Sequence, residues 1–228
     1  YKRQDKLNIN QDKFPLELYF CNNCNHIQLL DVVDPSILFK DYVYVSGTSP
    51  VFVNHFKEYA NTIIERFNPD KNFLVLDIGS NDGTLLQFFK NKKFQVLGID
   101  PAKNISSNAS KNGIDTITDF FTSELAKKIK NEYKKASIIT ANNDFAHADN
   151  LEDIVLGIKN LLSSDGVFIF EVSYLVDVLE KNLFDTIYHE HLSYHSIEPL
   201  KSFFLKNGLE MISAERINTH GGSIRGYV

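Results

Sequence analysis

The chain has 228 residues and a mass of 26.0 kDa, enough for one α/β domain with a small appendage but not for two large domains. Hydrophobic residues make up 43% and charged residues 23%, with a mean hydropathy of −0.21, values that are typical of a folded globular protein and exclude a disordered one. The net charge of −5 at pH 7 argues against a nucleic-acid partner, which needs a positive surface.

Signals for a membrane or for secretion are absent from the sequence. No apolar run approaches the roughly 18 residues of a membrane span, and no signal peptide opens the chain. We therefore expect a cytoplasmic protein without a membrane partner. The chain begins at Tyr1 without a methionine and ends in a strand-like pattern, Ser223 to Val228, that no loop follows. These ends lead us to expect a piece of a longer protein.

The two cysteines, Cys21 and Cys24, lie between two short apolar segments near the start of the chain. Asn22 and Asn23 between them favour a turn. This pattern is typical of the β-turn knuckle of a zinc ribbon, although two thiolates supply only half of a tetrahedral zinc site. We predict a partial zinc-binding segment over residues 1–45, with Cys21 and Cys24 as its metal ligands.

Residues 46–228 show the pattern of an α/β domain. Ser49 and Pro50 suit the start of a helix, and apolar residues at helical spacing extend it to about Phe67. Strand patterns then alternate with helical ones, and the chain ends in a hairpin pattern. The expected strands are 73–76, 94–99, 138–141 and 166–172, with the hairpin at 209–217 and 223–228. We predict a doubly wound, mostly parallel, Rossmann-like sheet with an antiparallel terminal strand.

The strongest local signal is the glycine-rich turn LDIGSNDGT, from Leu76 to Thr84, between a buried strand and a helix. Such a turn lets a ligand approach the backbone, and an acidic residue at the end of the next strand, Asp100, suits a ribose diol. The dinucleotide fingerprint requires glycine two and five residues after Gly79, where this chain has Asn81 and Thr84. The turn therefore argues against NAD.

Acidic residues in the same turn favour a cationic cofactor. Asp77 and Asp82 would repel a diphosphate but attract the ammonium and sulfonium groups of S-adenosylmethionine. Phe120 follows the third strand and is a candidate for stacking on adenine, and Asn142 ends the fourth strand, with Asn143 and His147 close behind it. The complete set of predicted cofactor-binding residues is Asp77, Gly79, Asn81, Gly83, Asp100, Phe120 and Asn142.

Three of the seven histidines lie in the segment YHEHLSYH, from Tyr188 to His195. A metalloprotease motif would need histidines four apart with glutamate after the first, but Ser193 stands four residues after His189. His191 and His195 would share a metal only in a helix, and no third ligand is evident. General-base catalysis by a histidine suits the segment better, with Glu190 orienting the base and Tyr188 near a substrate oxygen.

Taken together, these motifs resemble the sugar C-methyltransferases, which act on nucleotide-linked 4-keto deoxysugars. The resemblance rests on DYVYVSGTSP, LDIGSNDGTLL, NNDFAHADN, YLVDVLEKNLFDTIYHEHLSYHS and HGGSIRGYV, in this order along nearly the whole chain. Members of the family have an N-terminal zinc-binding domain with two CxxC pairs, a methyltransferase domain and a C-terminal domain that helps to hold the sugar nucleotide. Only one CxxC pair is present in this chain, and the segment for the third domain is absent from it.

The resemblance implies the fold of a class I S-adenosylmethionine-dependent methyltransferase, a mechanism and a set of catalytic residues. It places Tyr188, Glu190 and His191 at catalytic positions, with His147 and His195 lining the site. A base removes the proton beside the sugar ketone, and the enolate attacks the methyl group of S-adenosylmethionine in line. It implies zinc in the full-length protein.

Three other classes stay open at this point. They are an oxidoreductase, against which Asn81 argues, an O-methyltransferase of another small molecule, and a non-catalytic domain that binds S-adenosylmethionine or serves assembly.

Overall fold

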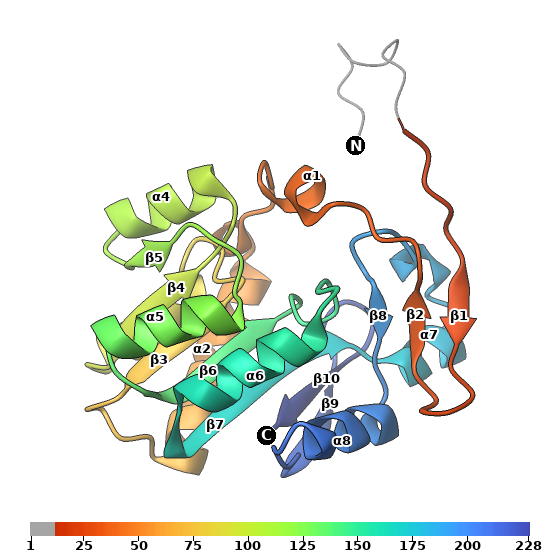
Figure 1. The fold of residues 1–228 in the computed structure, drawn as a ribbon. Helices are drawn as coiled ribbons and strands as arrows, with labels where there is room; N and C mark the ends of the chain where they lie inside the picture. The colour runs from red at the N-terminus through yellow and green to blue at the C-terminus, as the bar shows by residue number, and fades with distance from the viewer. Residues whose placement is uncertain (1–11) are drawn as a thin grey trace, which may run out of the picture.

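A seven-stranded sheet forms the centre of the computed structural model, which describes residues 12–228 (Figure 1). Its strand order is β5-β4-β3-β6-β7-β10-β9. The first five strands in this order are parallel, and β10 runs antiparallel to both of its neighbours. The bounds are β3 Leu74–Ile78, β4 Gln95–Ile99, β5 Thr116–Ile117, β6 Ala136–Asn142, β7 Leu162–Ser173, β9 Ser213–Ile217 and β10 Ser223–Tyr227. The predicted mostly parallel sheet with an antiparallel terminal strand is confirmed.

The terminal hairpin is shorter than the sequence predicted. Its first arm begins at Ser213, because the preceding residues complete the end of a helix instead. There the backbone N–H of Leu209 donates to the carbonyl of Phe204 at 3.0 Å. The start of the predicted zinc-binding segment, residues 1–11, lies outside the described residues.

Helices cover both faces of the sheet. The longest, α2, begins at Pro50 as predicted, and the Ser49 hydroxyl accepts a hydrogen bond from the N–H of Phe52. The bounds of the helices are α1 Pro35–Phe39, α2 Pro50–Phe67, α3 Thr84–Asn91, α4 Lys103–Lys111, α5 Ser123–Glu132, α6 Leu151–Leu161, α7 Leu175–Glu180 and α8 Ile197–Lys206. Within residues 12–228, none of them has the length and apolar character needed to cross a membrane.

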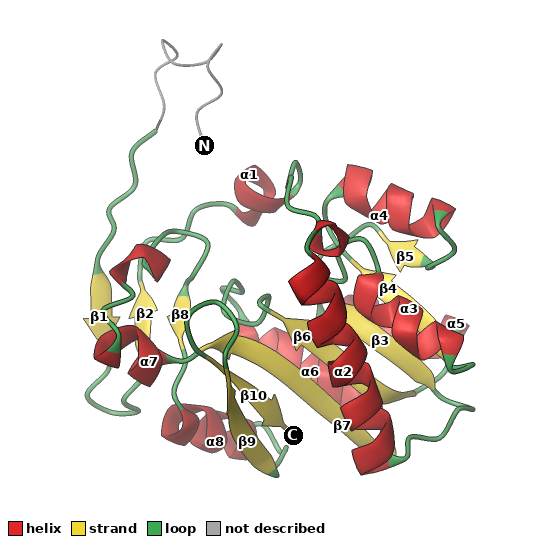
Figure 2. Cartoon of the chain, turned by 180° about the vertical axis from the view of Figure 1, so that it is seen from behind, coloured by secondary structure: helices red, strands yellow, loops and turns green. Residues whose placement is uncertain are grey.

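Alternating strand residues divide the core into two layers. Leu74 and Leu76 of β3 face a cluster that includes α5, α6 and α8, whereas Val75 between them faces a cluster formed with α2, α3 and α4. Figure 2 shows α2 crossing the second face. This alternation is typical of a strand that is buried on both faces. The loops at the carboxyl ends of the strands therefore begin from a rigid sheet.

A second, three-stranded sheet lies beside the main domain (Figures 1 and 2). Its strands are β1 Leu18–Phe20, β2 Ile27–Leu29 and β8 Ser193–Tyr194, all antiparallel. The cysteine-containing turn joins β1 to β2, as the sequence predicted. Because β8 comes from the far part of the chain, the N-terminal hairpin holds the segment that directly follows His191.

Candidate active site

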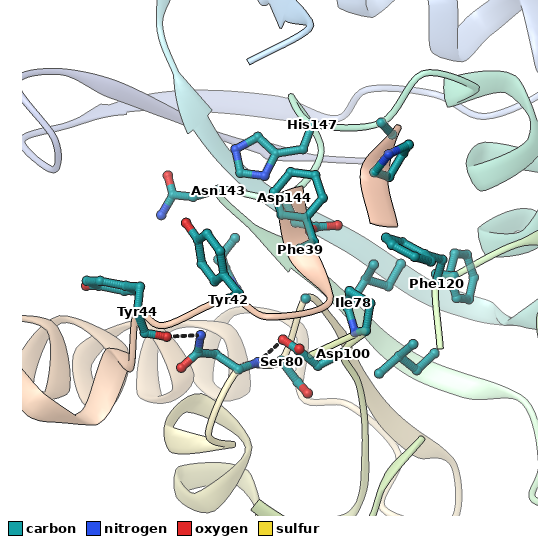
Figure 3. Close-up of a pocket in the computed structure, with 18 of the residues that line it drawn as sticks. Phe39, Tyr42, Tyr44, Ile78, Ser80, Asp100, Phe120, Asn143, Asp144 and His147 are labelled. Carbon is teal, nitrogen blue, oxygen red and sulfur yellow. Dashed lines mark hydrogen bonds between the residues drawn. The ribbon is translucent and has the colours of Figure 1, made fainter. Parts of the chain in front are cut away.

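A cavity of about 880 Å³ opens at the carboxyl ends of the parallel strands. The last residues of four strands line it, namely Ile78, Ile99, Asn142 and Ser173. This is the edge of a doubly wound sheet at which ligands bind, and the volume suits a small molecule. Figure 3 shows Phe120 and Tyr44 at opposite sides of the cavity, with Asp100 and Asp144 between them.

The turn between β3 and α3 requires its glycines. Gly79 has a φ of +68°, and a Cβ atom there would lie 2.8 Å from Cγ of Asp144. Gly83 has a φ of +78°, and its Cβ atom would lie 2.9 Å from a methyl group of Ile114. Left-handed backbone and close neighbours both disfavour larger residues at these two positions. Gly79 lines the cavity, whereas Gly83 packs against Ile114 and is not among the residues that line it.

Asp100 ties this turn to the end of β4. One carboxylate oxygen accepts the N–H of Asn81 at 2.9 Å (Figure 3), and the other accepts the N–H of Ala102 at 2.8 Å. Burial raises the pKa of Asp100, although the two backbone donors act in the opposite direction. Each oxygen retains lone-pair capacity for a further donor such as a ribose hydroxyl.

Asn81 lines the cavity, and its side chain holds a neighbouring loop. Its amide oxygen accepts the N–H of Ser46, and its amide nitrogen donates to the carbonyl of Tyr44, both at 2.9 Å. The amide therefore positions residues 44–46 at the cavity wall. The assignment of Asn81 to the cofactor site stays a prediction.

Two carboxyl groups beside the turn have raised pKa values. Burial raises the pKa of Asp77 to about 8, and the nearby Asp144 and Asp100 add to the effect. Thr140 donates to Asp77 at 2.6 Å, which opposes the shift. Desolvation also raises the pKa of Asp144 to about 7. Both groups would ionise more readily beside a cation.

At one side of the cavity, the rings of Phe39, His147 and His191 form a stack. The ring centroids are 5.3 Å apart between Phe39 and His147 and 5.2 Å apart between His147 and His191, with interplanar angles of 11° and 19°. Burial, together with the neighbouring His191, lowers the pKa of His147 to about 3. His147 is therefore neutral at pH 7, and its ring supports that of His191.

The hydrogen bonds of His191 define its tautomer. Its Nδ1 lies 2.7 Å from the carbonyl oxygen of Thr186, which only accepts, so Nδ1 carries the proton. Its Nε2 therefore has the lone pair, to which the Tyr188 hydroxyl donates at 3.2 Å. Burial lowers the pKa of His191, although the bond to Thr186 raises it. A neutral imidazole with its lone pair beside the cavity is suited to accept a proton.

Glu190 does not orient His191 in the way that the sequence predicted. Its carboxylate accepts a hydrogen bond from the Tyr42 hydroxyl at 3.3 Å, and burial raises its pKa. The orienting bond to His191 comes from the backbone of Thr186 instead. The main chain turns after residues 184–186, which form a short 3₁₀ helix, and this turn brings the carbonyl beneath the imidazole.

His195 was expected to line the same site and lies elsewhere. Its ring is 1% exposed, stacks on Phe145 at 5.5 Å and borders a separate cavity of about 480 Å³ with Cys24 and His26. His191 and His195 are joined by a strand and not by a helix, so they do not share a metal. Cys21 and Cys24 are exposed and reduced, and no group of three or more potential metal ligands occurs within residues 12–228.

Tyr42, Asp144 and His220 are among the cavity residues that the sequence analysis did not assign. Asp144 directly follows Asn143 behind the end of a strand, and this position was the available signal. Tyr42 and His220 lie in loops, within segments quoted for the family resemblance, but nothing in their local pattern indicates that they face the cavity. Phe120 and Asn142 do line it, as predicted.

Comparisons with known proteins agree with this geometry. The fold and the glycine-rich turn define a class I S-adenosylmethionine-dependent methyltransferase. The chain belongs to the methyltransferase domain family, whose model matches residues 53–214, and a zinc-binding domain model matches residues 1–39.

A curated relative and two solved structures show how far the similarity extends. The chain is 35% identical over 211 residues to the C-methyltransferase NovU of Streptomyces niveus, which confirms the expected family resemblance. This match covers 92% of the chain, and the chain spans about half of that protein, 50% of its length.

The fold is similar to the PH0226 protein of Pyrococcus horikoshii, with 14% identity, a TM-score of 0.62 and coverage of 86% of this chain and 95% of that one. It is also similar to the magnesium protoporphyrin IX methyltransferase ChlM of Synechocystis with bound SAH, with 16% identity, a TM-score of 0.59 and coverage of 85% and 98%.

The donor set at the sheet edge fits S-adenosylmethionine. Burial raises the pKa values of Asp77 and Asp144, and the cofactor carries two cationic groups that would favour their ionised forms. The Gly79 backbone, which tolerates no Cβ atom, leaves the turn open for close approach. The cavity thus offers both the charge and the space that this cofactor needs.

Proposed function

We propose that this protein transfers a methyl group from S-adenosylmethionine to the carbon next to the ketone of a nucleotide-linked 4-keto deoxysugar. The observation that carries the proposal is the hydrogen bonding of His191, which puts the proton on Nδ1 and the lone pair on Nε2, where the Tyr188 hydroxyl lies at 3.2 Å. The similarity to a C-methyltransferase supports carbon as the acceptor atom.

The cofactor would bind along the β3–α3 turn. Asp77 attracts its cationic groups, Asp100 accepts from its ribose hydroxyls, and the Phe120 ring packs on its adenine. Gly79 lets the main chain of the turn line the cavity, Gly83 supports the turn from outside it, and Asn142 lies at the end of β6 near the transferred group. The bound cofactor supplies an electrophilic methyl carbon, whose bond electrons pass to sulfur.

His191 and Tyr188 would divide the work on the sugar. Nε2 of His191 takes the proton from the carbon beside the ketone, and the two C–H electrons form the enolate. The Tyr188 hydroxyl, which lies 3.2 Å from Nε2, is close enough to meet substrate oxygen in the same space. The enolate carbon then forms the new C–C bond, and the ketone is restored.

His147 and Glu190 serve this base indirectly in our proposal. His147 supports the His191 ring by stacking, and Glu190 holds Tyr42 at the cavity wall through their hydrogen bond. Tyr42 thereby narrows the space available to the sugar.

We also propose the division of the chain into a partial zinc-binding segment, residues 1–45, and a methyltransferase domain, residues 46–228. Cys21 and Cys24 would supply two thiolates to a zinc ion in the full-length protein. The match of residues 1–39 to a zinc-binding domain model supports this assignment.

Transfer of a labelled methyl group tests the reaction. Full-length protein is incubated with S-adenosylmethionine carrying a ¹³C methyl group and with a nucleoside-diphosphate-linked 4-keto-6-deoxyhexose. We expect an NMR signal for a methyl group bonded to a ring carbon. A methyl group bonded to oxygen would contradict the proposal and assign the chain to O-methylation.

A further inference from the structure

His220 lies in the turn between β9 and β10 and lines the same cavity as His191. Its φ is +48°, a left-handed conformation that is uncommon for a residue other than glycine. Gly221 and Gly222 follow with φ values of +82° and +148°, and a Cβ atom on Gly222 would lie 2.5 Å from Cγ of Asp177. The turn is therefore tightly packed. It has a histidine in a left-handed conformation that glycine would adopt without strain.

The His220 ring is held from two sides. The Asn143 amide nitrogen lies 3.4 Å from Nε2 of His220, and the Phe52 ring centroid lies 5.0 Å from that of His220. Because an amide nitrogen only donates, Nε2 is the acceptor, and the proton of the neutral ring is on Nδ1. Asn143 is fixed in turn by its own N–H, which donates to the carbonyl of Glu171 at 2.8 Å.

Burial lowers the pKa of His220, although the nearby carboxylate of Glu171 raises it. That carboxylate is already bonded to His55 at 2.8 Å and to Nε of Arg225 at 2.6 Å. The ring is therefore neutral at pH 7 and offers an N–H donor. A neutral imidazole polarises a carbonyl without carrying a charge that the cavity would have to accommodate.

His191 and His220 share one tautomer, with the proton on Nδ1 and the lone pair on Nε2. In His191 the N–H donates to the backbone of Thr186 and Nε2 accepts from the Tyr188 hydroxyl, whereas in His220 Nε2 accepts from the Asn143 amide and Nδ1 carries the N–H. The two rings lie near enough for a charge on His220 to lower the pKa of His191.

We infer that His220 is a second catalytic residue, whose Nδ1–H donates a hydrogen bond to the ketone oxygen of the substrate as this becomes the enolate oxygen. The inference rests on the proposed function. As His191 Nε2 takes the proton from carbon, the electron pair of the C–H bond moves toward the carbonyl, and the negative charge develops on the oxygen that His220 contacts. When the enolate carbon bonds to the methyl group, the charge returns from oxygen, and His191 releases its proton to solvent.

Three substitutions of His220 in the full-length protein test this role. His220→Gly removes the ring and tolerates the left-handed backbone. His220→Asn also tolerates it and places an amide N–H near the position of Nδ1, whereas His220→Gln reaches only to the position of Nε2. The readout is deuterium exchange of the proton beside the ketone of a nucleoside-diphosphate-linked 4-keto-6-deoxyhexose, followed by NMR with adenosylhomocysteine present. The affinity for adenosylhomocysteine reports whether each variant is folded.

We expect His220→Gly to slow the exchange by about 10²-fold, the usual cost of removing one donor to an oxyanion. His220→Asn should recover at least about tenfold of this loss, and His220→Gln should not, since only the first restores a donor at Nδ1. Exchange in His220→Gly within twofold of the unmodified protein overturns the inference, as does equal exchange in the Asn and Gln variants.

The same measurement separates this inference from the proposed function. If the unmodified protein does not exchange the proton, both fail. If it does, and His191→Asn abolishes exchange while His220→Gly leaves it intact, only the role of His220 fails.

Discussion

The two halves of the cavity are built in different ways. The half that would hold the cofactor comes from one β-strand, the turn after it and the end of the next strand, with Asp77, Gly79 and Asp100 as its key residues. The proposed catalytic half brings His191 together with His147 and with loop residues from both ends of the described chain. Cofactor binding would therefore depend on a local unit and the proposed base on tertiary contacts, so the two functions should fail separately.

His191→Asn in the full-length protein should give the largest difference between the loss of turnover and the loss of cofactor affinity. General-base catalysis contributes about 10² to 10⁴-fold, so turnover should fall by that factor, while the affinity for adenosylhomocysteine stays nearly unchanged. Steady-state kinetics and calorimetry measure the two quantities. His189→Asn is the matched control with a much smaller effect, because Nε2 of His189 bonds the carbonyl of Pro15 outside the cavity. Equal losses in the two variants would contradict the assignment.

Asp100→Ala should produce the reverse pattern. The lost ribose hydrogen bonds should weaken adenosylhomocysteine binding by roughly 1.5 to 3 kcal/mol, about 10- to 150-fold. The turnover at saturating cofactor should fall much less, because His191 remains in place. Calorimetric titration measures the affinity. Unchanged binding in the variant would remove Asp100 from the cofactor site.

Leu29→Ala tests whether the two halves of the cavity fail separately when the change lies outside the cavity. Leu29 is 3% exposed, packs with Leu192 and Tyr194, and its N–H donates to the carbonyl of Leu192 at 2.9 Å. Loosening this contact should shift His191 and reduce turnover by about tenfold, since small misplacements of catalytic groups are costly. The affinity for adenosylhomocysteine should not change. Leu161→Ala, a cavity-forming change in the main core, is the control. Weaker cofactor binding in Leu29→Ala would show that the two halves are coupled.

The smallest effect concerns pH. Asp77 and Asp144 have pKa values of about 8 and about 7, whereas an unfolded carboxyl group ionises near pH 4. The folded chain holds these protons more tightly, so their contribution to stability is present below about pH 4 and is lost as the pH rises through the folded values.

A bound cation lowers both pKa values, so cofactor binding should release protons. The affinity for S-adenosylmethionine should rise about three- to tenfold between about pH 6 and 8.5. Calorimetry in two buffers of different ionisation enthalpy counts the protons. An affinity that falls over this range, or proton uptake, would contradict the placement of the cations beside these carboxyl groups.

Most of the fold followed from the sequence because the signals were local. Buried strand runs, the Ser49–Pro50 helix start and the glycine turn each lie within a few residues, and the structure has all three. The hairpin arm near Leu209 was placed too early because an apolar stretch at a helix end resembles a strand.

The catalytic half was less predictable for a physical reason. The bond between Glu190 and Tyr42 and the separation of His195 from His191 arise from chain segments that meet only in the folded protein. Spacing within the segment from Tyr188 to His195 carries no information about such partners. The family resemblance pointed to this segment, but only the structure shows the hydrogen bonds that set the tautomer of His191.

The pairing of β2 with β8 also bears on the order in which the parts of the cavity form during synthesis and folding. It joins residues 27–28 to residues 193–194, one of the longest loops that this chain closes, and closing a long loop is entropically slow. A chain synthesised only as far as the end of α6, at Leu161, already contains the glycine turn, Asp77, Asp100 and Asp144. The segment that carries His191 has not yet been made at that stage. During synthesis, the residues of the proposed cofactor site are therefore made before the proposed base. A partly synthesised chain that lacks His191 could not start the proposed reaction.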